Sequence, residues 1–178
     1  MSIGSVLKLL KPQDLSTYQA HLLRLDRKSR WSRFNYVAGD AAIHAHCDRL
    51  RTNGGLVLGA YTGELMRGAA EITKTDRADE GDVELAFSVE REFQHCGIGA
   101  RLLAQALKLA EPARAVLVCR PDNTDMLQLT SRFGARVSYA GDQLVCVIAT
   151  SPVHSIRPAG PSKSHFEPEF TDFACGYV

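Results

Sequence analysis

The segment that most restricts how this chain can fold runs from Val83 to Ala110 and reads VELAFSVEREFQHCGIGARLLAQALKLA. Its first seven residues are mostly apolar, which predicts a β-strand over 83–89. Gly97 and Gly99 follow this strand. After them apolar side chains recur at spacings of three and four, which predicts an amphipathic helix; they are Leu102, Leu103, Ala106, Leu107 and Ala110. The strand is therefore joined to the helix through a turn that carries very little side-chain bulk.

A turn of this kind suits a negatively charged ligand. The first turn of a helix exposes unpaired N–H groups and partial positive charge, and glycines let a ligand approach the backbone closely. The stretch from Gln94 to Ala100 has these parts. A dinucleotide-binding fingerprint would need a third glycine where Leu102 stands, and a Walker-type loop would need Gly-Lys-Ser/Thr, so both are disfavoured. Glycines that merely make a tight turn remain the alternative.

The rest of the sequence predicts one mixed α/β domain over residues 1–150, with a sheet covered by helices. We expect helices after Asp14 and Asp40, and an exposed connection over the basic stretch 24–34 between them. Residues 73–81 are charged and aperiodic and predict a loop. The other elements are expected as strands at 5–10, 55–61, 64–72, 83–89, 115–119, 135–139 and 143–149, and as helices at 99–110 and 124–133.

The tail over 151–178 does not continue the sheet, because it holds four of the seven prolines. We expect it to be disordered or to dock on its own domain or a second subunit. Its four aromatic side chains favour docking, since they would be a liability if exposed.

Bulk properties narrow the function classes. The net charge of +1 gives no sign of nucleic-acid binding, and the apolar segment at residues 5–10 is too short for a signal peptide or a membrane span. The five cysteines are odd in number and widely spaced, which favours reduced thiols and a cytoplasmic location. His44, His46 and Cys47 have metal-binding side chains, but no second ligand pair accompanies them, so we expect ordinary packing and no metal.

Three segments together resemble the GCN5-related N-acetyltransferase (GNAT) family. Gln94, Gly97 and Gly99 match its motif Gln/Arg-x-x-Gly-x-Gly/Ala, and the hairpin over 55–72 matches the strands that precede this motif. The segment RPDNTDMLQLTSRFGARV is similar to the family's later Asn-x-x-x-x-x-Leu-x-x-x-x-Gly-Phe pattern, with Ala135 in place of the aromatic residue. The resemblance covers roughly residues 5–149. It implies a mixed, mostly antiparallel sheet of about seven strands, and acetyl-CoA as co-substrate.

The resemblance also implies where the co-substrate would bind. The backbone of Phe87 and Val89 would pair with the pantetheine arm, the amides from His95 to Ala100 would hold the pyrophosphate, and Asn123 would contact the pantetheine or shape its channel. Arg91 and Arg101 would add counter-charge or remain solvated surface residues. The full set of expected cofactor-binding residues is Phe87, Ser88, Val89, Gln94, His95, Cys96, Gly97, Ile98, Gly99, Ala100 and Asn123.

Acetyl transfer to an amine needs a base, because an alkylamine has a pKa near about 10.4 and is protonated at neutral pH. Glu84 is our candidate. It shares one face of the strand with Ala86 and Ser88, and burial would raise its pKa. The alternatives are an exposed residue at the strand's start, or a partner for an arginine of 24–34. The strand is similar to that of bacterial protein-lysine acetyltransferases, whose glutamate base has the matching position.

Thr130 departs from the family, many of whose members carry a tyrosine there that protonates the CoA sulfur. Ser88, Tyr139 or water could take over this role.

The sequence thus predicts an N-acetyltransferase acting on a protein lysine or a small-molecule amine, with no nucleic-acid or membrane partner. The alternatives are a catalytically silent acyl-CoA-binding module and an interaction protein that binds no CoA. The sequence leaves the acceptor, the acyl chain and the oligomeric state open, a homodimer included.

Overall fold

The computed structural model describes residues 4–75, 81–111 and 114–150. The expectations for the tail over 151–178 lie outside these ranges, and so does most of the predicted loop over 73–81.

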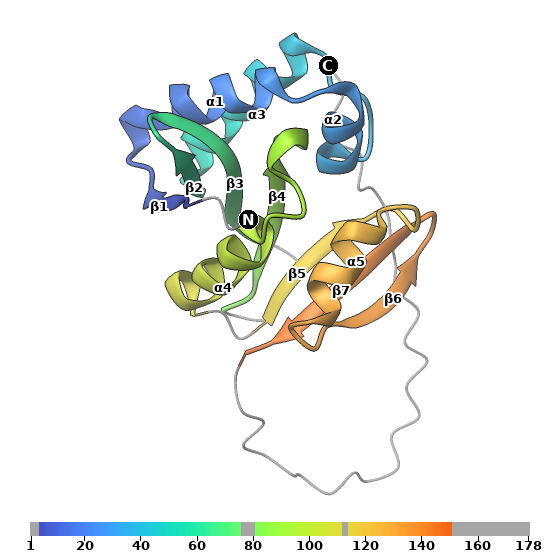
Figure 1. Ribbon diagram of the computed structural model, residues 1–178. Coiled ribbons are helices and arrows are strands. Elements are labelled where there is room, and N and C mark those ends of the chain that lie inside the picture. Colours follow the sequence, from blue (N-terminus) through green and yellow to red (C-terminus); the bar gives the residue numbers. More distant parts are fainter. Residues whose placement is uncertain (1–3, 76–80, 112–113, 151–178) are drawn as a thin grey trace, which may run out of the picture.

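A seven-stranded sheet forms the centre of the molecule (Figure 1). All neighbouring strands are antiparallel except β4 and β5, which are parallel, so the predicted mixed and mostly antiparallel sheet is confirmed. In sheet order the strands are β1 (Val6–Leu9), β2 (Leu56–Thr62), β3 (Leu65–Lys74), β4 (Val83–Val89), β5 (Arg114–Cys119), β7 (Gln143–Ala149) and β6 (Arg136–Ala140).

Helices cover both faces of the sheet, and each face has its own hydrophobic core. The helices are α1 (Leu15–Arg24), α2 (Arg27–Phe34), α3 (Asp40–Asn53), α4 (Ile98–Ala110) and α5 (Thr124–Ser131). One core joins Tyr18 and Leu22 of α1 and Ile43 of α3 to the β2–β3 hairpin. The other joins α4 and α5 to the opposite face, where Leu85 and Phe87 of β4 are buried. Residues alternate along β4 as predicted, because Glu84, Ala86 and Ser88 face α1–α3.

The basic stretch 24–34 is not an exposed connection, and this prediction was wrong. Residues Arg27–Phe34 form α2, which begins where the Asp26 carboxylate accepts a 2.7 Å hydrogen bond from the Ser29 N–H. Arg33 at the end of this helix is buried against a carboxylate rather than solvated. A short helix with so many charges lacks an apolar stripe, so hydrophobic periodicity could not reveal it.

Several other helix and strand ends differ by one or two residues from those expected from the sequence. Gly39 rather than Asp40 caps α3, β3 extends to Lys74, α4 begins at Ile98, and α5 ends at Ser131.

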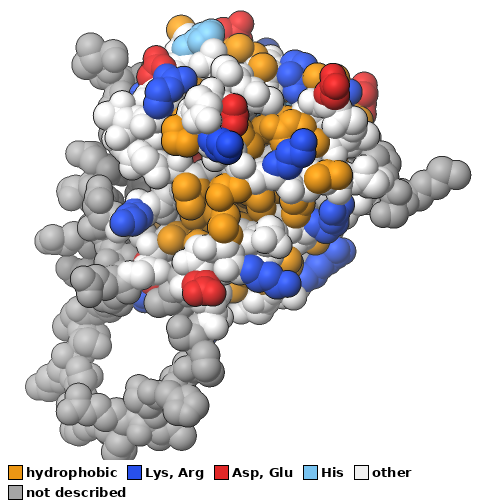
Figure 2. All heavy atoms as spheres, turned by 90° about the vertical axis from the view of Figure 1, so that its left-hand side faces the viewer, with side chains coloured by type: hydrophobic (Ala, Val, Ile, Leu, Met, Phe, Trp, Pro, Cys, Tyr) orange, Lys and Arg blue, Asp and Glu red, His pale blue; other side chains and the backbone are white. Residues whose placement is uncertain are grey.

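Hydrophobic side chains reach the surface at the β1 edge of the sheet. Figure 2 shows them gathered on the face that carries β1, with Lys and Arg side chains around them. The large exposed hydrophobic residues of β1, β2 and β3 are Val6, Leu9, Leu56 and Leu65. Within the described ranges, no helix combines the length and apolarity needed to cross a membrane.

Candidate functional site

The parallel strands β4 and β5 separate almost as soon as they meet. Their register holds two pairs, Val83 with Ala115 and Glu84 with Val116. On the other side of β4, the Glu90 N–H donates to the Arg67 carbonyl of β3 at 2.9 Å. Backbone groups of an antiparallel strand alternate in direction, so those of Ser88 also face β3 while those of Phe87 and Val89 face the gap beside β5.

A cavity of about 320 Å³ lies at this gap. It is bounded by β4, the turn after it, the start of α4, and side chains of α2 and α5. Most of the expected cofactor-binding residues line it, namely Phe87, Ser88, Val89, Gln94, His95, Gly97, Gly99, Ala100 and Asn123. Cys96, Ile98 and Glu84 do not. The Ile98 side chain is buried in the core, so only its amide could face a ligand.

The glycine turn has the geometry of an anion site. Gly97 adopts a φ of +81° and caps α4 without any side-chain hydrogen bond, so the first amides of this helix lack an intrahelical partner. A Cβ added at Gly97 would meet nothing within 4 Å, and one added at Gly99 would lie 3.5 Å from Leu129. The start of α4 therefore presents unpaired N–H groups and the positive end of the helix dipole to the cavity.

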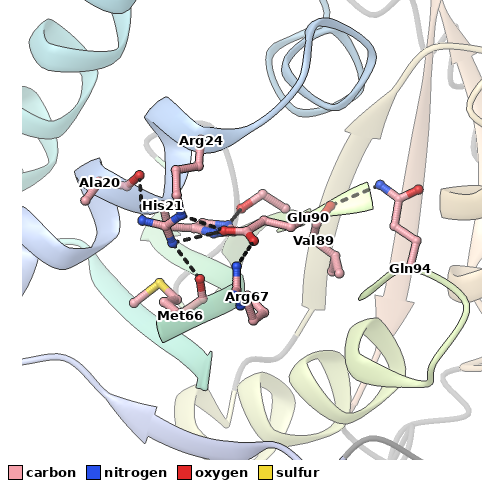
Figure 3. Close-up of polar contacts among 9 residues, drawn as sticks. Ala20, His21, Arg24, Met66, Arg67, Val89, Glu90 and Gln94 are labelled. Carbon is pink, nitrogen blue, oxygen red and sulfur yellow. Dashed lines mark hydrogen bonds and ion pairs between the residues drawn. The ribbon is translucent and has the colours of Figure 1, made fainter. Parts of the chain in front are cut away.

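Gln94 braces this turn against β4. Its side-chain amide donates to the Val89 carbonyl at 3.0 Å, as Figure 3 shows, and lies 3.4 Å from the Ser29 hydroxyl. One of the main-chain groups that face the gap is thus already engaged by the protein itself.

Asn123 lines the cavity and also begins α5, because its side-chain oxygen accepts from the Met126 N–H at 3.2 Å. Thr130 is fully buried further along α5 and donates its hydroxyl to the Met126 carbonyl at 3.0 Å. It cannot act in the cavity. Tyr139, a suggested substitute, is 78% exposed on β6 and is not among the residues that line the cavity.

The two arginines suggested as counter-charges behave differently. Arg91 is exposed, lines the cavity and lies 3.7 Å from Asp26. Arg101 instead donates to the Ser5 hydroxyl and carbonyl, tying α4 to the residue before β1.

Glu84 is not among the residues that line the cavity. It lies four positions before Ser88 along β4, a separation of roughly 13 Å at about 3.3 Å per residue. Its side chain is half-buried, and its pKa is raised. Burial is the main cause; the nearby charge of Arg33 acts to lower the pKa and that of Glu71 acts to raise it. Among the described residues, no hydrogen bond or ion pair to the Glu84 carboxylate is found. Arg33, one of the arginines of 24–34 considered as its partner, instead binds Glu71 at 2.8 Å.

Glu71 is the centre of a buried cluster that the sequence did not reveal. Its carboxylate accepts from the Tyr18 hydroxyl at 2.9 Å, from Arg33 at 2.8 Å and from His46 Nε2 at 2.7 Å. Burial acts to raise the pKa of Glu71, but Arg33, His46 and Tyr18 outweigh it and lower the pKa to about 2. The one sequence feature that could have indicated this cluster is the position of Glu71 as a charged residue inside the apolar run GAAEI. His46 is thus a partner of a carboxylate, and the described residues contain no cluster able to hold a metal ion.

A second missed cluster reaches the cavity. His21 of α1 is fully buried, with Nε2 at 3.0 Å from the Ser88 hydroxyl and Nδ1 at 3.4 Å from Glu90 Oε1. Glu90 also accepts from Arg24 at 3.0 Å and Arg67 at 2.7 Å (Figure 3). Burial acts to raise the pKa of Glu90, but hydrogen bonds from His21, Arg67 and Arg24 lower it to about 2. Nothing in the spacing of these residues connects them, since His21 and Ser88 lie 67 positions apart.

Solved structures with this architecture include complexes with coenzyme A and with acetyl-CoA. The GNAT domain of S. lividans PAT matches with a TM-score of 0.69 at 15% identity, covering 82% of this chain and 90% of that one. PaiA N-acetyltransferase from Thermoplasma acidophilum, in complex with coenzyme A, matches with a TM-score of 0.59 at 17% identity, covering 82% and 99%. The protein yncA from Salmonella typhimurium, with its cofactor acetyl-CoA, matches with a TM-score of 0.58 at 14% identity, covering 88% and 99%. At such identities the likeness establishes the fold alone.

The comparison of the sequence with family models identifies the family as well as the fold. No curated protein matches it, but the model of the acetyltransferase (GNAT) family matches residues 20–135, well over half of the chain. This range includes β4, the glycine turn and α4, which are the elements that build the cavity. The chain belongs to the GNAT family of N-acetyltransferases.

Proposed function

We propose that the protein transfers the acetyl group of acetyl-CoA to a primary amine, either a protein lysine or a small molecule. The observation that carries this proposal is the cavity where β4 leaves β5, lined by the start of α4, whose first amides have no side-chain cap. An extended thioester with a diphosphate at its far end matches both features, because one needs a strand edge and the other needs free amides.

The residues present fit coenzyme A. The amides of Ile98, Gly99 and Ala100 would hold the diphosphate, with Arg91 as counter-charge at the cavity. The Phe87 backbone and the Val89 N–H would pair with the pantetheine arm, since Gln94 already occupies the Val89 carbonyl. The bound thioester supplies an activated acetyl carbonyl and a thiolate leaving group.

Glu84 is the proposed base that removes the first proton from the acceptor ammonium. Its raised pKa supports this role, because a base works best when its pKa approaches the working pH. Its distance from the cavity requires a water between Glu84 and the amine. The similarity of this strand to bacterial protein-lysine acetyltransferases makes a lysine side chain the acceptor to test first.

The location we propose is the cytoplasm. The four cysteines within the described residues are all free thiols, which supports a reducing compartment.

Acetyl-CoA and a panel of amines test the function. The panel holds lysine peptides, polyamines and amino acids, and acetylation is followed both as released thiol and as acetylated amine by mass spectrometry. We expect amine-dependent release with at least one class. Release that stays at the level of the no-amine control for every class would contradict the proposal.

Glu84→Gln tests the base. We expect kcat to fall about a hundredfold at neutral pH with an unchanged Kd for coenzyme A, because a general base contributes about 10²–10⁴-fold and Glu84 lies outside the cofactor cavity. Glu64→Gln, in the exposed turn between β2 and β3, is the matched control. Full activity in Glu84→Gln would remove Glu84 from the mechanism.

A catalytically silent acyl-CoA-binding module is the second candidate. It is favoured by Thr130, whose buried hydroxyl is bonded within α5 and leaves the family's tyrosine position without an acid. Coenzyme A binding by calorimetry together with no turnover of any amine would identify this function.

A further inference from the structure

Two protons must leave the acceptor amine during acetyl transfer. Glu84 is the proposed acceptor of the first proton, and no group has yet been assigned to the second. An ammonium R–NH₃⁺ carries three hydrogens and the amide product carries one. Glu84 passes the first proton to solvent. The second must leave the nitrogen as it bonds to the acetyl carbon, and the sulfur released from that carbon takes up one proton. An internal relay from nitrogen to sulfur would satisfy both needs, and Thr130 cannot supply it.

We propose that Ser88 and His21 form this relay and that Glu90 positions it. The proposal rests on the proposed acetyl transfer and assigns a proton path to the same cavity. Ser88 is the one member that lines the cavity, next to the main-chain groups of Phe87 and Val89 that would hold the thioester. His21 lies directly behind it, fully buried, with Nε2 at 3.0 Å from the hydroxyl.

The partners of His21 set its tautomer. Nδ1 faces the Glu90 carboxylate, which can only accept, so Nδ1 carries the hydrogen and Nε2 of the neutral ring is left as an acceptor. The Ser88 hydroxyl therefore donates to Nε2, and its oxygen is free to take a proton from the cavity side. This order of carboxylate, imidazole and hydroxyl is the one that serine hydrolases use to draw a proton from the hydroxyl.

Glu90 is fixed as a carboxylate. Arg24 reaches it from α1 and Arg67 from β3, and together with His21 they lower its pKa to about 2. Arg24 also donates to the Met66 carbonyl at 2.8 Å and to the Ala20 carbonyl at 3.0 Å, so this side of the cluster is tied to the backbone (Figure 3). The imidazole ring is thus held in one orientation and does not need to turn during the reaction.

The transfer balances in two steps. As the amine nitrogen bonds to the acetyl carbon, its proton passes to Ser88 Oγ while the hydroxyl proton of Ser88 passes to His21 Nε2, leaving an imidazolium beside Glu90. The carbon–sulfur bond then breaks, Ser88 gives a proton to the thiolate, and Nε2 returns its proton to Ser88 Oγ. The serine and the histidine end as they began, and the products are the amide and the free thiol.

Kinetics of matched variants test the relay. We expect Ser88→Ala and His21→Asn each to lower kcat about a hundredfold with acetyl-CoA KM within a factor of about two, because Asn keeps a donor for Glu90 but has no basic nitrogen. Ser88→Thr retains the hydroxyl and should restore most of the rate. Ser138→Ala on exposed β6 and His44→Asn on the exposed side of α3 are the controls.

A second readout does not depend on turnover. The thiolate of bound coenzyme A is followed by ultraviolet absorbance as pH is raised. In the wild type the relay accepts the thiol proton, so the thiol of bound coenzyme A should ionise at lower pH than that of free coenzyme A. Ser88→Ala should abolish this difference while coenzyme A still binds.

The outcomes separate the two proposals. A wild type that binds coenzyme A but acetylates no amine overturns the acetyl transfer and the relay with it. An active wild type whose Ser88→Ala variant keeps full kcat, or the same thiol titration, overturns the relay and leaves the acetyl transfer standing. An acetyl group found by mass spectrometry on Ser88 after mixing with acetyl-CoA would also overturn the relay, since the serine would then act as a nucleophile.

Discussion

At Gly97 the backbone takes a φ of +81°, a conformation that an L-residue with a side chain adopts only with strain. Gly99, two residues on, lies within α4 and lines the cavity. Space is not the constraint at either position, because a Cβ at Gly97 meets nothing and one at Gly99 makes an ordinary contact with Leu129. The first glycine is therefore needed by the backbone, and we propose that the second is needed by the ligand.

Alanine substitutions should separate these two requirements. We expect Gly97→Ala to lower the free energy of unfolding by about 1–2 kcal/mol, since the left-handed conformation costs that much with a side chain. Gly99→Ala should leave stability nearly unchanged or raise it, because alanine favours the helix, yet weaken coenzyme A binding severalfold. Urea unfolding and calorimetry measure the two effects. Equal losses of stability in both variants would contradict this division.

The element scale is dominated by Glu71, which joins three helices to one strand. Its carboxylate on β3 binds Tyr18 of α1, Arg33 of α2 and His46 of α3. This buried carboxylate thus ties α1, α2 and α3 to β3. Breaking such a pair leaves the other charge buried without compensation, which is costlier than the pair itself is stabilising.

The Glu71 cluster predicts a specific acid dependence of stability. The pKa of Glu71 in the fold, about 2, is below the ordinary 4.5, so its contribution is complete above pH 4.5 and is lost as pH falls toward 2. Glu71→Gln should cost about 3 kcal/mol at neutral pH and flatten this acid limb, as measured by urea unfolding at several pH values. Asp48→Asn, which breaks the exposed pair with Arg51, should cost less than about 1 kcal/mol. An acid limb unchanged in Glu71→Gln would place the titration elsewhere.

Elements with a strong period could be predicted from the sequence, and those held by tertiary contacts could not. The strands and α4 follow from alternating or helical apolar spacing, and the glycine turn from its two glycines. The helix α2 has no apolar stripe and depends on Asp26 at its start and on Glu71 at its end. The His21–Ser88 contact joins residues distant in sequence, so only the packing of α1 against β4 could show it.

On the scale of the whole molecule, the cavity-lining residues in the part of the chain that the structure describes all fall within 26–132. The β6–β7 hairpin contributes no lining residue among those described. The site is thus built on the central strands of the sheet. The hairpin of β6 and β7 is connected to it through the pairing of β7 with β5.

A chain that ends at Thr150 should bind coenzyme A as tightly as the full chain, because every described lining residue remains. Calorimetry on both proteins checks this, with thermal unfolding as the accompanying measurement. A lower Tm with an unchanged Kd would show that the tail docks on the domain away from the cavity. A weaker Kd would contradict the prediction and bring the tail to the site.

The early parting of β4 from β5 limits how stable this protein can become. Continued pairing of these two strands would add several main-chain hydrogen bonds, each contributing about 1 kcal/mol, and would at the same time close the gap that we propose the pantetheine arm enters. Selection for thermal robustness and selection for turnover therefore pull in opposite directions along this one line of the sheet.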